Sequence, residues 1–95
     1  MATDPRALAA QAADTMEASL NADSASLPTG LAEQYRAGIR IAREAAASTD
    51  DGETEALLKS ALSQLAEPPT VFMPDTLRRA GQTARTLLDQ ARNAT

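Results

Sequence analysis

Three arginines in the middle of the chain, Arg36, Arg40 and Arg43, are spaced by four and then three residues. On a helix this spacing places all three guanidinium groups on one face. Guanidinium groups are rigid forks of donors that suit a phosphate, a cluster of carboxylates or an acidic partner. The favoured interpretation is simpler: a solvated face, with Glu33 and Glu44 as local partners, because exposed charged helix faces are common.

A second basic group lies nearer the C-terminus, where Arg78 and Arg79 are followed by Arg85 and Arg92. A helix that binds nucleic acid needs a basic patch, often with aromatic side chains that stack on bases. This chain has a net charge of −4, one Phe, one Tyr and no Trp. Direct binding to nucleic acid is therefore not expected.

Between two prolines and Pro74 lies the apolar run Val71, Phe72 and Met73, which holds the single Val and the single Phe of the chain. A rigid extended segment loses little entropy on binding, so this run is a candidate docking loop. The favoured alternative is that Phe72 and its neighbours close the end of the fold, since so small a core can hardly spare its one Phe.

Catalytic and metal-binding chemistry finds little support in the residue types. The chain has neither His nor Cys, so it lacks the usual neutral-pH acid–base group and the thiolate nucleophile. Its acidic residues gather as Asp50, Asp51, Glu53 and Glu55, without the alternating oxygen ligands of a calcium loop, and the helix dipole alone favours acids at a helix start. We expect no enzyme activity, no catalytic residue, no metal site and no cofactor.

The elements that position these residues are predicted to be helices over about residues 4–22, 31–47, 51–66 and 75–93. Asp4 with Pro5 is typical of a helix start, and so is Asp50 with Glu53 three residues later. Apolar residues recur at helical spacing in all four segments, and no segment shows the alternation of a strand. The chain is expected to form one domain over residues 1–95: an all-α, compact antiparallel bundle of three to four short amphipathic, alanine-rich helices.

The apolar residues also predict how these helices pack. Leu, Ile, Val and Phe together number only 15, and about half of the apolar residues are alanine. We expect segments 31–47 and 75–93 to make much of the close contact, with Gly38 and Gly81 marking close helix approaches. Segment 4–22 has few large apolar groups, so it is expected to pack weakly or to exchange between copies.

These observations predict a non-catalytic accessory protein that acts by protein–protein interaction, as an adaptor, an inhibitor or an assembly subunit. So small a core favours a partner protein or a second copy, hence a homo-oligomer. The alternative is a binder of an anionic ligand, nucleotide or nucleic acid through the arginine-lined faces. No membrane span and no signal peptide are visible in the sequence, so the expected compartment is the cytoplasm.

Overall fold

Four helices make up nearly all of the computed structural model, which describes residues 4–23, 29–66 and 74–94. They are α1 (Pro5–Asp23), α2 (Thr29–Ala47), α3 (Asp51–Gln64) and α4 (Asp75–Ala94). Each end lies within two residues of its predicted position, and no strand occurs in the described ranges. The predicted all-α bundle is confirmed.

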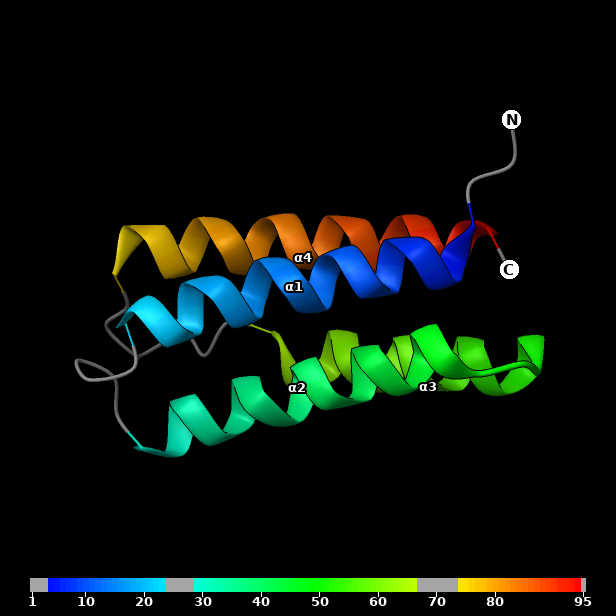
Figure 1. Cartoon of the computed structure of the whole chain (residues 1–95), viewed down its shortest axis with the longest axis horizontal. Helices are drawn as coiled ribbons and strands as arrows, with labels where there is room; N and C mark the ends of the chain where they lie inside the picture. The colour runs from blue at the N-terminus through cyan, green and yellow to red at the C-terminus, as the bar shows by residue number, and fades with distance from the viewer. Residues whose placement is uncertain (1–3, 24–28, 67–73, 95) are drawn as a thin grey trace.

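Successive helices run in opposite directions and form an up-down-up-down bundle (Figure 1). Each helix packs along two others, in the closed order α1, α2, α3, α4 and back to α1. Helices α1 and α3 therefore lie on one diagonal, and α2 and α4 lie on the other. The molecule measures 38 × 23 × 21 Å, and its long dimension follows from helices of up to 20 residues that rise about 1.5 Å per residue.

Helix ends are fixed by local signals in the sequence. The amide of Arg6 donates to Asp4 Oδ1 at 2.9 Å, and the amide of Glu53 donates to Asp50 Oδ2 at 3.0 Å. Each bond satisfies an amide that has no partner within the first turn of its helix. At the other end of α3, the Leu65 amide donates to the Ala61 carbonyl at 2.9 Å and closes the last turn.

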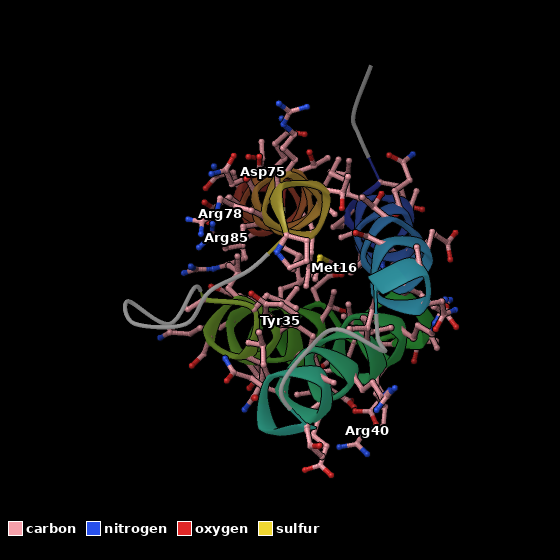
Figure 2. All side chains as sticks on the ribbon, turned by 90° about the vertical axis from the view of Figure 1, so that its left-hand side faces the viewer. Met16, Tyr35, Arg40, Asp75, Arg78 and Arg85 are labelled. Atoms are coloured by element: carbon pink, nitrogen blue, oxygen red, sulfur yellow. The ribbon has the colours of Figure 1, made fainter. Side chains whose placement is uncertain are left out.

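The core is one continuous cluster of leucines and alanines with a single aromatic ring. Figure 2 shows Met16 of α1 and Tyr35 of α2 in the interior of the bundle, and both side chains are almost fully buried. Fully buried alanines occur on every helix, and their small side chains let the helix axes approach closely. They include Ala12, Ala42, Ala61, Ala84 and Ala91.

Helix α1 packs more extensively than its residue types predicted. It lies along both α2 and α4, and these are the two most extensive helix contacts in the bundle. The prediction of a weakly packed first helix is wrong because it counted only large side chains, whereas Ala9, Ala12 and Ala13 are fully buried. Helices α2 and α4, which were expected to make much of the close contact, each pack extensively along α1, while they lie diagonal to one another.

The two glycines in the interior of helices, Gly38 in α2 and Gly81 in α4, differ in their surroundings. A Cβ at Gly38 would lie 2.7 Å from Leu65 Cδ2 and 3.3 Å from Gln64 Cβ, so α3 approaches α2 closely at this point. A Cβ at Gly81 would meet only Met16 Sδ, at 4.0 Å, which is ordinary contact. The predicted close approach is therefore present at Gly38 and absent at Gly81.

Two long polar side chains tie the helices together near their ends. Gln34 Nε2 donates to the Gln64 carbonyl at 2.8 Å and so gives a partner to the carboxyl end of α3. Arg6 donates through Nε to the Ser48 carbonyl and through Nη2 to Asp51 Oδ1, the latter at 3.3 Å. These bonds join α1 to the α2–α3 turn and α2 to the end of α3.

Candidate functional site

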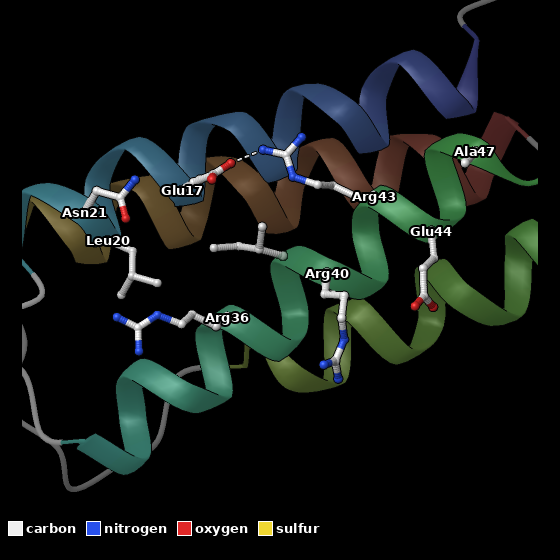
Figure 3. A pocket seen from close by; sticks show the side chains of 9 residues that line it. Glu17, Leu20, Asn21, Arg36, Arg40, Arg43, Glu44 and Ala47 are labelled. Carbon is white, nitrogen blue, oxygen red and sulfur yellow. Dashed lines mark hydrogen bonds and ion pairs between the residues drawn. The ribbon is translucent and has the colours of Figure 1, made fainter.

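The candidate site is a groove on the outer surface between α1 and α2, here called the α1–α2 groove (Figure 3). Its volume is about 500 Å³. The floor is apolar and the rim is charged, which is the usual composition of a protein-binding groove. It is lined by Glu17, Leu20, Asn21, Arg36, Ile39, Arg40, Arg43, Glu44 and Ala47.

The apolar floor comes from the edge of the core. Leu20 of α1 and Ile39 of α2 are buried, with 2% and 7% of their surface exposed, so the floor is firmly held by the bundle itself. Ala47, at the end of α2, is exposed and small. The groove therefore exists without rearrangement of the helices.

Arg43 has a structural role at the rim of the groove. Its Nη2 donates to Asp14 Oδ1 at 3.1 Å and also to Glu17 Oε2, and both acids belong to α1. The hydrogen bond with Glu17 is the main cause that raises the pKa of Arg43 above its ordinary value, and Asp14 adds to it. Arg43 thus clamps α1 to α2, and its charge is already compensated.

Arg36 and Arg40 differ from Arg43 because no carboxylate of a described residue compensates their charges. Both side chains are exposed, and neither forms an ion pair with any residue that the structure describes. Figure 3 shows Arg36 extending beside Leu20, while Arg40 points away from α1. The three arginines share one broad face of α2, as predicted, but their guanidinium groups diverge and do not form one anion clamp.

The charge of the groove is opposite in sign to that of the whole chain. Three arginines and two glutamates line it, whereas the chain carries a net charge of −4. Because Arg43 is compensated by α1, the charge that remains available to a ligand is that of Arg36 and Arg40, with Glu44 one turn further along α2. The groove can therefore attract carboxylates at one end and a cation at the other.

The arginines of α4 lie elsewhere and are not brought to the groove. Arg78 is half-buried and Arg79 is exposed, and as successive residues of a helix they point about 100° apart around α4. Figure 2 shows Arg78 and Arg85 on the same side of α4, the side nearer α3. Since α4 is diagonal to α2, the two basic groups of the sequence occupy separate faces of the bundle.

The remaining predicted residues have other positions. Val71, Phe72 and Met73 lie outside the described residues, so the candidate docking loop has no structural account. Of the acidic group, Asp50 caps α3 and Asp51 contacts Arg6. Within the described ranges, no three acidic residues gather as ligands for a metal ion.

Sequence reasoning missed what α1 contributes to this site. Glu17, Leu20 and Asn21 line the groove, and Asp14 helps to hold Arg43. The spacing of Asp14 and Glu17, three residues apart on one helix face, was the available signal. It identifies an acidic face but not the helix that pairs with it.

Comparisons with known proteins give no match, so the function of this chain is inferred from the geometry of the α1–α2 groove. No protein-family model matches the chain, and neither a curated protein nor a solved structure shows a significant match to it. Among the described helices, none is both long and apolar enough to cross a bilayer.

Proposed function

We propose that this chain is a non-catalytic accessory protein that binds a protein segment in the α1–α2 groove. The observation that carries the proposal is the pair Arg36 and Arg40, exposed and without an ion-pair partner among the described residues, at the rim of a groove with an apolar floor. Exposed arginines beside apolar surface are enriched in protein interfaces. An adaptor, an inhibitor or an assembly subunit would all use such a surface.

The direction of the side chains favours a protein segment over a small anion. A phosphate or carboxylate ligand is held best by guanidinium groups that converge on it. Here Arg43 turns to α1 and Arg40 turns away from it (Figure 3). A small anionic ligand held by the arginine face is the second candidate. Inorganic phosphate would compete with such a ligand for the arginines, and this competition would distinguish the two candidates.

We place the protein in the cytoplasm, in keeping with a chain that has no cysteine.

Site-specific photo-cross-linking in the source cells tests the proposal. A photoreactive residue at Ala47 lies in the groove, and one at Gln82, exposed on α4, serves as the control. We expect a discrete cross-linked protein from position 47, none from position 82, and a strong reduction when Arg36 and Arg40 are both changed to Gln. Cross-linking that is equal at both positions, or indifferent to the two arginines, would contradict the proposal.

A further inference from the structure

Helix α2 carries a row of three exposed charges at intervals of one turn, here called the α2 row: Arg36, Arg40 and Glu44. Along the helix the signs read plus, plus, minus. No ion pair joins any member of the row to a described residue. The first two members form the rim of the α1–α2 groove, and the third also lines it.

Helix α3 carries a second row with the same spacing, here called the α3 row: Asp51, Glu55 and Lys59. All three residues are exposed, and their signs read minus, minus, plus. Asp51 contacts Arg6 at 3.3 Å but keeps 84% of its side chain exposed. Glu55 and Lys59 form no ion pair within the described part of the chain.

The two rows are complementary in order and spacing when the helices run parallel. Within one molecule α2 and α3 are antiparallel neighbours, so the rows cannot pair in that register (Figure 1). Only a second copy can present its α3 row in the parallel direction. Both rows follow ridges of residues four apart, and two such ridges align when helices cross at about 50°, a common packing angle.

We propose that the α1–α2 groove is occupied by α3 of a second copy of this chain, which runs in the same chain direction as α2 and crosses it at about 50° with the two rows paired. This inference rests on the proposed function of the groove as a protein-binding site. In the same register, Ala47 of one copy faces Leu62 of the second copy. Leu62 is half-buried in its own bundle and adds an apolar contact beside the ion pairs.

The contact joins two different surfaces, so it is heterologous. After one contact has formed, the copy that used its groove keeps a free α3 row, and the copy that used its α3 row keeps a free groove. Contacts of this kind close into rings or extend into open chains. The assembly is therefore expected to grow beyond a dimer as concentration rises, and to weaken with salt because all paired groups are exposed.

Sedimentation velocity over a concentration series tests the proposal, with circular dichroism to confirm that each variant is folded. The wild-type chain should associate below about 1 mM in about 0.1 M salt and dissociate in about 1 M salt. Arg40→Glu and Glu55→Arg should each raise the dissociation constant by roughly tenfold, since each replaces an attraction with a repulsion. Two matched controls, Arg79→Glu and Glu53→Arg, make the same charge changes outside the rows and should behave as wild type.

Charge exchange supplies the decisive comparison. The double variant Arg40→Glu/Glu55→Arg should recover wild-type association, and an equimolar mixture of the two single variants should associate as tightly as wild type although each alone associates about tenfold more weakly. A wild-type chain that stays monomeric at about 1 mM, or a double variant that is not restored, overturns the second copy as occupant. If cross-linking at position 47 still captures a different protein, the proposed function stands; if it captures nothing, both fail.

Discussion

At the scale of single residues, the two helix-interior glycines, Gly38 and Gly81, show how much residue type alone can predict. Both lie on apolar faces of their helices and looked equivalent in the sequence. Only Gly38 faces a neighbouring helix so closely that a methyl group would collide with it. The difference depends on the position of Leu65, the residue directly after α3, which no local pattern around either glycine contains.

Replacing each glycine by alanine should change the free energy of unfolding in opposite directions. Gly81→Ala is expected to raise the free energy of unfolding by about 1 kcal/mol, because it removes a helix-interior glycine and its Cβ has room. Gly38→Ala is expected to lower it by about 1–2 kcal/mol, because overpacking against buried Leu65 outweighs the gain in helix propensity. Urea unfolding followed by circular dichroism measures both, and equal shifts in one direction would contradict this account.

Arg43 and Arg40 make a second pair of residues that sequence alone could not separate. Arg43→Gln should lower the free energy of unfolding by up to about 1 kcal/mol, since it removes two half-exposed ion pairs, and the loss should shrink in high salt. Arg40→Gln should leave stability within about 0.5 kcal/mol of wild type, because no described residue pairs with it. The raised pKa of Arg43 means that, wherever the Asp14 and Glu17 carboxylates are ionised, its contribution is fully present below the ordinary arginine range and is lost only as the pH rises through the raised pKa. Thermal unfolding at low and high salt tests both variants.

At the scale of elements, the helix ends were the most predictable part of the structure. Asp4 with Pro5 and Asp50 with Glu53 act on amides two or three residues away, so a short window of sequence contains the whole interaction. The packing of α1 was not predictable in this way. It depends on which alanines face α2 and which face α4, and that requires the arrangement of all the helices.

The cap of α3 offers a quantitative test at this scale. Asp50→Ala should destabilise the fold by about 0.5–2 kcal/mol, because the Glu53 amide loses its partner and the α3 dipole loses a favourable charge. Asp50→Asn keeps the acceptor oxygen and should recover most of the loss. The two variants compared by chemical denaturation distinguish capping from charge: if Asn were as harmful as Ala, the hydrogen bond would not be the cause.

At the scale of the whole molecule, the sequence predicted one wall of the candidate site, on α2, but not the other wall, on α1. The α2 face with its three arginines follows from spacing along one helix. The groove does not, because its other wall is α1, and the compensation of Arg43 by Asp14 and Glu17 joins residues more than 25 positions apart. A surface shared by two helices is a property of the bundle, and sequence spacing describes one helix at a time.

The closed order of helix contacts predicts that the bundle unfolds as one cooperative unit. Every helix buries its apolar face against two neighbours in one continuous core, so no helix can leave without exposing the others. Tyr35, the single tyrosine, is 1% exposed and reports on the core, while far-ultraviolet circular dichroism reports on all the helices. At low micromolar concentration the two signals should give the same urea midpoint and the same slope.

Hydrogen exchange should protect the middle of α1, around Ala12 and Ala13, as strongly as the middle of α2. An earlier loss of α1 would show that alanine contacts hold this helix less firmly than its burial indicates, and would restore the idea that it exchanges between copies.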